Sequence, residues 1–229
     1  MVKAKIAVFL LTVMALSGVA VAQVAVQVAG TQSDVYWVSY FDYRNNNLTS
    51  YNAYDQTVRI INPGTSVAAA TDATPETLCA DIYVFDAMDD MVECCNCKIG
   101  PNVLLKLSVN YNLTYNPAAG GPPPALGVIK IISDSGRNCN AKAPQPTPDL
   151  RASATHLQAL PTPVATGTPY NSVSQPFVIY AFTEEPFQDA PLNLVEQLNL
   201  GQGCSTIQKQ GKGAGVCTCS YQASNPSAP

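Results

Sequence analysis

The chain has 229 residues, of which 47% are hydrophobic and 12% are charged, and its net charge is −4. Because soluble domains usually carry about 25% charged residues, Asn, Gln, Ser and Thr must supply much of the polar surface. The acidic balance and the lack of a Lys- and Arg-rich cluster argue against a nucleic-acid partner, since phosphate contacts need basic side chains.

The first 22 residues have the composition of a cleavable signal peptide. Lys3 and Lys5 precede an apolar run from Ile6 to Leu16, and Ala20-Val21-Ala22 forms the small-residue pattern of a cleavage site. The apolar run is shorter than the roughly 20 residues of a membrane-spanning helix, so we expect no transmembrane segment after cleavage. The sequence therefore predicts a secreted protein, periplasmic or extracellular, with a mature chain of 207 residues and a net charge of −6.

Short segments rich in β-branched and aromatic residues recur along the mature chain, between turns rich in Pro and Gly. The predicted strands are residues 35–41, 56–61, 80–85, 104–113, 126–132 and 177–182, while residues 150–157 suit either a strand or a helix. This order lacks β–α–β alternation, and it predicts a mainly β fold, an antiparallel β-sandwich of immunoglobulin-like or jelly-roll-like type.

One β-rich domain is expected to span residues 23–219, followed by a disordered tail at 220–229. Pro- and Gly-rich composition predicts loops at 116–124, 143–148 and 160–176. A helical element is predicted at 189–210, because Leu192, Val195 and Leu198 recur at helical spacing. Asp189 would cap a first helix that ends at Gly201, and a second short helix would carry Cys204 and hold the element against the sandwich.

The densest aromatic run falls in and after the first predicted strand. Its members are Tyr36, Trp37, Tyr40, Phe41, Tyr43, Tyr51 and Tyr54. Alternation along a strand turns Tyr36 and Tyr40 to one face, and Trp37, Phe41 and Tyr43 to the other. We expect most of these rings in the core, although one set could stay exposed and stack on the apolar face of a sugar.

The mature chain holds eight cysteines, and an even number in an exported protein predicts up to four disulfides. They are Cys79, Cys94, Cys95, Cys97, Cys139, Cys204, Cys217 and Cys219. A hairpin centred on the acidic turn at 86–90 would place Ile82 opposite Cys95 and bring Cys79 level with Cys97. We therefore expect a Cys79–Cys97 disulfide, with Cys79–Cys95 as the alternative.

Other cysteines are constrained by their position in extended chain. Cys94 and Cys95 are adjacent and should face opposite sides of a strand, so they are expected to have different partners. Cys217 and Cys219 should share a face, and one of them is expected to meet Cys204. A cysteine metal or redox site is the alternative, but C-C-N-C and C-T-C spacing spreads thiolates poorly around a tetrahedral ion.

Carboxylates cluster around the same hairpin. They are Asp81, Asp86, Asp89, Asp90 and Glu93, with Glu184 and Glu185 near another strand end. The main interpretation is a solvated turn. Asp86, Asp89 and Asp90 are also weak candidates for a calcium site, although the EF-hand pattern is missing. The third interpretation is a hydrolase that acts on carbohydrate, which needs two carboxylates across a cleft.

No residue is assigned a catalytic role from the sequence, and no cofactor is implied. His156 is the one histidine of the chain, and no nucleophile elbow or zinc-protease motif is present. A lone histidine in a segment rich in Thr and Gln is more typical of a structural position than of a catalytic one.

Four segments of the mature chain form one pattern: A-D-I-Y-V-F-D at 80–86, E-C-C-N-C at 93–97, G-V-I-K-I-I-S at 127–133 and G-V-C-T-C at 215–219. Together they resemble a group of exported, cysteine-rich bacterial proteins without an assigned activity. The similarity spans residues 57–219 and implies bacterial export and a shared disulfide-bonded core. It implies no activity and no site residues.

From these features the sequence predicts a non-catalytic structural or binding module of the cell envelope or extracellular space. Its candidate partners are a carbohydrate or an envelope protein. The alternatives are the secreted hydrolase and the cysteine-based metal or redox protein.

Overall fold

The computed structural model describes residues 35–42, 55–65, 77–135, 139–160, 179–209 and 213–220. The predicted signal peptide and the tail after Ser220 lie outside these residues, as do Tyr43, Tyr51 and Tyr54. Of the loop predicted at 160–176, only Leu160 is described, and it is the last residue of a strand.

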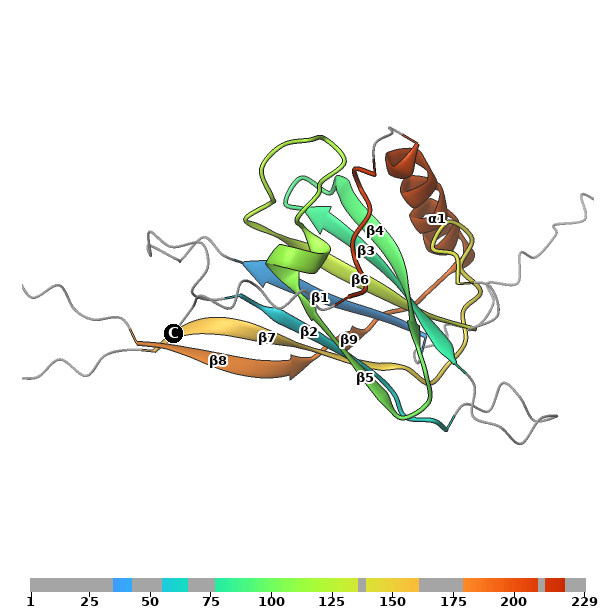
Figure 1. Ribbon diagram of the computed structural model, residues 1–229, viewed down its shortest axis with the longest axis horizontal. Coiled ribbons are helices and arrows are strands. Elements are labelled where there is room, and N and C mark those ends of the chain that lie inside the picture. Colours follow the sequence, from blue (N-terminus) through green and yellow to red (C-terminus); the bar gives the residue numbers. More distant parts are fainter. Residues whose placement is uncertain are drawn as a thin grey trace, which may run out of the picture.

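Two antiparallel sheets, with nine strands among the described residues, form a sandwich (Figure 1). The first sheet has the order β4-β3-β6-β1-β9, with β1 at Tyr36–Asp42, β3 at Leu78–Asp86, β4 at Met91–Ile99, β6 at Leu126–Ser135 and β9 at Gln188–Asp189. The second has the order β5-β2-β7-β8, with β2 at Thr57–Asn62, β5 at Val103–Ser108, β7 at Arg151–Leu160 and β8 at Ile179–Pro186. The predicted mainly β fold is confirmed, and the ambiguous segment at 150–157 is part of a strand.

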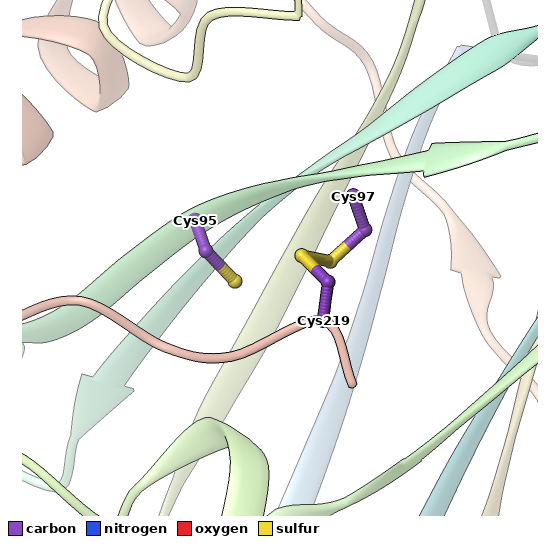
Figure 2. Close-up of side chains that lie close together, drawn as sticks. All are labelled: Cys95, Cys97 and Cys219. Carbon is purple, nitrogen blue, oxygen red and sulfur yellow. A yellow bond between two sulfur atoms is a disulfide. The ribbon is translucent and has the colours of Figure 1, made fainter. Parts of the chain in front are cut away.

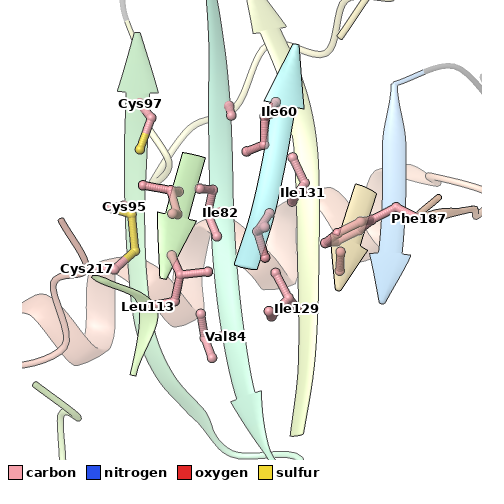
Figure 3. Packing of buried hydrophobic residues seen from close by; sticks show 14 of the residues in the cluster. Ile60, Ile82, Val84, Cys95, Cys97, Leu113, Ile129, Ile131, Phe187 and Cys217 are labelled. Carbon is pink, nitrogen blue, oxygen red and sulfur yellow. A yellow bond between two sulfur atoms is a disulfide. The ribbon is translucent and has the colours of Figure 1, made fainter. Parts of the chain in front are cut away.

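The main hydrophobic core lies between the two sheets, on what we call the inner face of each. Alternate residues of the strands, among them Ile82 and Val84 of β3 and Ile60 of β2, are buried there (Figure 3). Burial of each such aliphatic side chain stabilises the fold by about 1.5–3 kcal/mol. The period-two pattern of the sequence therefore produces a core of the expected kind.

A second apolar cluster covers the outer face of the first sheet. Tyr83 of β3 and Ile132 of β6 pack there against Leu200 and Ile207 of the helix α1 (Leu194–Gln208). Figure 1 shows α1 beside β4, on the side of the first sheet that faces away from the second. The helical element predicted at 189–210 is thus present, within narrower bounds.

The details predicted for that helical element are wrong. One helix continues through Gly201, and Asn193, not Asp189, caps it by accepting a hydrogen bond from Glu196 N at 2.9 Å. Val195 and Leu198 are exposed, at 67% and 52%. Gly201 faces the rest of the protein. A Cβ atom at this position would lie 2.5 Å from the Lys142 carbonyl oxygen, so only glycine permits this close approach.

The strand predicted at 104–113 ends at Ser108, where a single π-helical turn (Val109–Leu113) begins. Ser108 Oγ accepts from Tyr111 N, and Asn112 Oδ1 accepts from Ser108 N, both at 2.8 Å. These short polar side chains offer the backbone an alternative to the sheet ladder. Within the described residues, no helix has the length and hydrophobicity to cross a membrane.

Candidate binding groove

All eight cysteines form disulfides. The pairs are Cys79–Cys139, Cys94–Cys204, Cys95–Cys217 and Cys97–Cys219, with Cα–Cα distances of 5.6, 5.7, 5.2 and 5.3 Å. Cys94 and Cys95 have different partners, as predicted. Four disulfides are typical of proteins that mature in an oxidising compartment outside the cytoplasm.

The expected Cys79–Cys97 and Cys79–Cys95 pairings are wrong, although the predicted register of Ile82 with Cys95 is confirmed. In that register Cys79 lies opposite Lys98, and Cys97 lies opposite Ala80. An offset of one residue places two strand side chains on opposite faces of a sheet. Cys79 therefore reaches the outer face and bonds Cys139, which follows β6.

The pairing expected between Cys204 and the C-terminal cysteines is wrong for the same reason. Cys204 lies on α1, above the outer face to which Cys94 points, whereas Cys217 and Cys219 bond cysteines on the inner side. The Sγ atoms of Cys95, Cys97 and Cys219 lie within 4.8 Å of one another (Figure 2). Each is held in a disulfide, so none is a thiolate available to a metal ion.

The sheet separates the carboxylates that the sequence groups around the hairpin. Asp81 lies on the outer face beside Tyr83, whereas Glu93 lies opposite Val84 on the inner face. Both side chains are fully buried. The turn residues Asp89 and Asp90 are exposed. Neighbours in sequence are therefore not neighbours in space, because alternate side chains of a strand point to opposite sides.

Asp81 and Asp134 form a buried carboxyl pair. Asp134 Oδ2 accepts from Gln145 N at 2.8 Å, while among the described residues neither oxygen of Asp81 meets an N–H or O–H donor. Burial, a hydrogen bond to Asp134 and the charge of Asp134 raise the pKa of Asp81 far above its ordinary value of 3.8. Two carboxyl groups can hydrogen-bond to each other only when one keeps its proton, so the pair holds a proton at neutral pH.

Substitution of Asp81 by Asn tests this protonation state. Folded Asp81 keeps a proton that the unfolded chain releases. The contribution of Asp81 to the free energy of unfolding is therefore complete below about pH 4, and it declines as pH rises toward the folded-state pKa. We expect Asp81→Asn, which supplies a neutral donor, to raise the free energy of unfolding at pH 8 by about 1–3 kcal/mol and to flatten its pH dependence. Urea unfolding at pH 5 and pH 8 measures both effects. Equal pH slopes in the two proteins would contradict a shared proton.

Glu93 has the raised pKa of a general acid, but its side chain is fully buried in the described part of the chain. Burial raises its pKa to about 7, although Asn116 N, which donates to Oε1, lowers it in part. The side chain is fully buried and lines neither of the two cavities described below. Glu93 therefore serves as a structural acceptor for the backbone at Asn116.

The acidic turn at 86–90 is held by its own hydrogen bonds. Asp86 Oδ1 accepts from Met88 N at 2.8 Å and from Asp90 N at 3.0 Å, and Asp89 adopts a left-handed conformation with φ of 65°. Among the described residues, the one group of three candidate ligand atoms within 4.8 Å is the cysteine cluster above. The oxygens of Asp86, Asp89 and Asp90 do not converge in this way, which favours the solvated turn.

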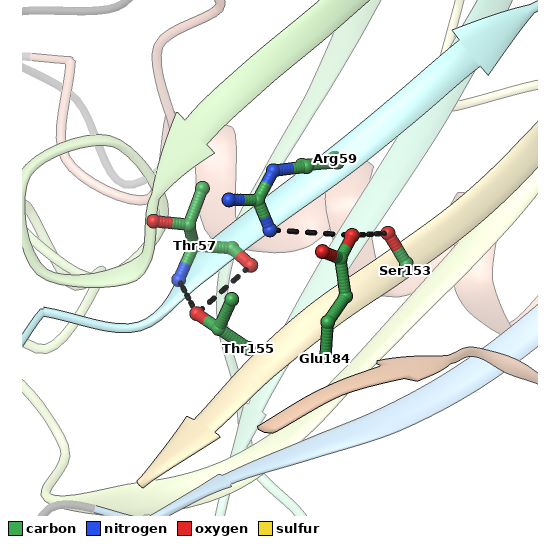
Figure 4. A network of polar contacts seen from close by, with 5 residues as sticks. All are labelled: Thr57, Arg59, Ser153, Thr155 and Glu184. Atoms are coloured by element: carbon green, nitrogen blue, oxygen red, sulfur yellow. Dashed lines mark hydrogen bonds and ion pairs between the residues drawn. The ribbon is translucent and has the colours of Figure 1, made fainter. Parts of the chain in front are cut away.

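Glu184 and Glu185 lie on the second sheet, at opposite faces of β8. Glu184 forms an ion pair with Arg59 at 3.3 Å and accepts from Ser153 Oγ at 2.7 Å (Figure 4). Thr57 N donates to Thr155 Oγ1 at 2.8 Å in the same network. The two glutamates are thus separated from the hairpin carboxylates by the sandwich itself.

A groove of about 440 Å³ lies at one end of the first sheet, across the neighbouring strands β1, β6 and β3. Its aromatic and aliphatic lining includes Tyr40, Phe85 and Val128, and its acidic lining includes Asp42, Asp86 and Asp89. A smaller cavity of about 210 Å³ lies between β4, residues 140–142 and the C-terminal cysteines. Of these two cavities of the described chain, the larger is lined by both aromatic and acidic side chains, and the smaller has no aromatic lining.

Tyr40 forms a fixed aromatic platform in this groove. Its ring is 51% exposed and stacks on the buried imidazole of His156, with a centroid distance of 4.3 Å and an interplanar angle of 18°. Burial lowers the pKa of His156, against the opposing charge of Glu185, so the imidazole is neutral at neutral pH. Of the two tyrosines predicted to share a face, Tyr36 is buried beneath α1 and Tyr40 remains open to solvent.

Phe85 is the second ring of the groove, and a charged network orders the residues beside it. Lys130 Nζ lies 4.7 Å from the Phe85 ring centroid and donates to Glu196 Oε1 at 2.8 Å. Tyr36 OH donates to the same oxygen at 2.9 Å. Burial raises the pKa of Glu196, but these two donors and the Lys130 charge lower it by more. The charge of Lys130 is therefore balanced by Glu196 of α1, and its ammonium group is held against the Phe85 ring.

The sequence singled out Tyr40, Asp86 and Asp89 but missed Phe85, Val128 and Gly127. The signal that could have found Phe85 is the strand register, because Tyr40 and Phe85 both pair with Val128. That register requires knowledge that β6 lies between β1 and β3, and the chain order does not supply it.

No family model matches the sequence, and no curated protein matches it. Among solved structures, an Anabaena sensory rhodopsin transducer matches 44% of this chain and 88% of its own, with 14% identity and a TM-score of 0.29. That similarity is too low to carry an inference about fold or function.

Proposed function

We propose that the protein is an exported, non-catalytic binding module whose ligand occupies the groove between Tyr40 and Phe85. The observation that carries the proposal is the Tyr40 ring, which is half exposed yet held in place by a buried histidine. A ligand that stacks on a rigid ring loses little conformational entropy from the protein on binding. The disulfides and the predicted signal peptide support export, and the resemblance to exported bacterial proteins agrees with it.

Binding is favoured over hydrolysis by the positions of the carboxylates. A glycoside hydrolase needs two carboxyl groups about 5–9.5 Å apart across a cleft, one of them with a raised pKa. The groups with strongly raised pKa values, Asp81 and Glu93, are buried on opposite faces of the sheet and do not line the groove. The groove carboxylates Asp42 and Asp86 lie at the ends of β1 and β3, and Asp89 lies in the turn after β3.

A comparison of two tyrosine variants tests the proposed site. Tyr40→Ala removes the platform, and Tyr115→Ala removes a ring of similar exposure, 53%, that does not line the groove. We expect compounds that bind the native protein to bind Tyr40→Ala at least 10-fold more weakly, since a stacked contact contributes about 1.5 kcal/mol or more. Thermal shift across a library of saccharides, amines and short peptides, followed by calorimetry, measures this loss.

Tyr115→Ala is the control for the loss of affinity expected in Tyr40→Ala. Tyr115→Ala should retain native affinity, and both variants should keep native circular dichroism. Ligands that bind both variants equally, or a library without any ligand for the native protein, would refute the groove as the binding site.

A further inference from the structure

We propose that the groove takes a neutral oligosaccharide, with two linked sugar units placed over Tyr40 and Phe85. This inference rests on the proposed binding function and adds the chemical class of the ligand. It depends on the spacing of the two rings, on the polar groups at the rim and on the charge already present beside Phe85.

The strand register sets the spacing of the two aromatic residues. Tyr40 of β1 and Phe85 of β3 both lie directly opposite Val128 of β6. Directly paired residues in antiparallel strands share one face, so the Cα–Cβ bonds of these three residues start toward the same side of the sheet. The Tyr40 ring then stacks on His156 of β7. Neighbouring strands are about 4.8 Å apart, which places the two aromatic residues roughly 10 Å apart. That span is comparable to a disaccharide unit, with Val128 beneath the linkage.

Aromatic faces suit sugar rings for an electrostatic reason. The π face of an aromatic ring is negative, and it attracts the weakly positive C–H groups on the apolar face of a pyranose. The reverse face of Tyr40 is occupied by His156, which leaves the exposed side of its ring for a ligand. Phe85 is only half-buried and lines the same groove.

Polar groups at the rim match the hydroxyls of a sugar. Asp86 and Asp89 line the groove next to Phe85, and Asp42 lines it next to Tyr40. Two backbone donors fix the position of the Asp86 carboxylate, so this acceptor is ordered before the ligand binds. A carboxylate accepts hydrogen bonds from hydroxyl groups, and such charge-assisted bonds are about twice as strong as neutral ones.

The charges in and around the groove exclude two competing ligand classes. Three aspartates repel an acidic polysaccharide. A cationic ligand would normally stack on an aromatic ring, but the ammonium group of Lys130 lies 4.7 Å from the Phe85 ring centroid, so its charge repels a second cation there. A neutral chain of sugars avoids both conflicts, and it uses the aspartates as acceptors.

Calorimetry with neutral gluco-, xylo-, manno- and N-acetylglucosamine oligosaccharides of one to six units tests the inference. In at least one series we expect affinity to rise 10-fold or more between one unit and two. Phe85→Leu, which keeps apolar volume, should remove most of this gain and leave monosaccharide binding within about 2-fold. Tyr40→Ala should weaken both, and Tyr115→Ala should change neither.

A second variant avoids any effect on the sheet. Asp89→Asn keeps a residue that tolerates the left-handed conformation, and it should reduce oligosaccharide affinity by about 3–10-fold through loss of a charged acceptor. If the only ligands of the groove are amines or peptides, with binding lost in Tyr40→Ala, the proposed function stands and this inference fails. If saccharides bind but Tyr40→Ala and Phe85→Leu bind them as tightly as the native protein, both proposals fail.

Discussion

Replacement of Gly127 by alanine is expected to lower the free energy of unfolding by about 4 kcal/mol or more, or to prevent folding. A Cβ atom at this position would lie 1.9 Å from the Phe85 carbonyl oxygen and 2.8 Å from Cζ of Phe41. The first neighbour is backbone and the second is a buried ring, so neither can move without disturbing the sheet or the core. Gly127 thus allows β6 to lie between β1 and β3 where the Phe41 ring crosses it.

Gly121→Ala provides the matched control. A Cβ at Gly121 has no heavy atom within 4 Å, so its stability should remain within about 0.5 kcal/mol of the native value. Guanidinium unfolding of both variants, or soluble yield where Gly127→Ala fails to fold, measures the contrast. A Gly127→Ala protein as stable as Gly121→Ala would mean that the sheet accommodates the methyl group and that the close approach is unimportant.

Removal of the Cys94–Cys204 disulfide is the second substitution with a large expected effect. The double variant Cys94→Ala/Cys204→Ala should lose about 3–5 kcal/mol of unfolding free energy, because the bond closes a loop of 110 residues. It should also release α1. The helix contains Gly201 and Gly203, which lower its helix propensity, and Leu194, Val195 and Leu198 on it are exposed, so it depends on tertiary attachment.

Hydrogen exchange of the helix amides separates these two effects. Amides of α1 should lose protection in Cys94→Ala/Cys204→Ala, while those of β3 and β6 retain it. The control is Cys97→Ala/Cys219→Ala, which removes a bond of similar loop length, 122 residues, on the inner side of β4. This control should lose comparable stability but keep α1 protected. Loss of helix protection in both variants would contradict a specific attachment through Cys94.

Local pattern accounts for the parts of the fold that sequence analysis predicted correctly. The hairpin of β3 and β4 follows from a turn flanked by two β-rich segments, and Ile82 lies opposite Cys95 as expected. A bulge between Val84 and Phe85 shifts the register, so that Phe85 pairs with Met91. Strand alternation correctly placed Trp37 and Phe41 on one face, and the structure shows that this face is the core.

Errors arose where a long-range partner decides the outcome. The pairing of Cys79 depends on Cys139, 60 residues away, which is carried to the outer face by β6. The buried face of α1 depends on the Cys94 disulfide and on Lys142. Neither partner is visible in the period of the helical segment itself, whose most regular apolar positions, Val195 and Leu198, remain exposed.

Sequence alone determined the β-rich class, the presence of a C-terminal helical element and the conclusion that the cysteines pair. Hydrophobic period and turn composition are properties of a few neighbouring residues, and the cysteine count is a property of the composition, so none of them requires the tertiary structure. Tertiary structure alone decided which cysteines bond, that Asp81 meets Asp134, and that Tyr40 and Phe85 line one groove. Those outcomes follow from the order of strands in a sheet. That order brings together side chains far apart in the chain, through register and face, and no local pattern encodes it.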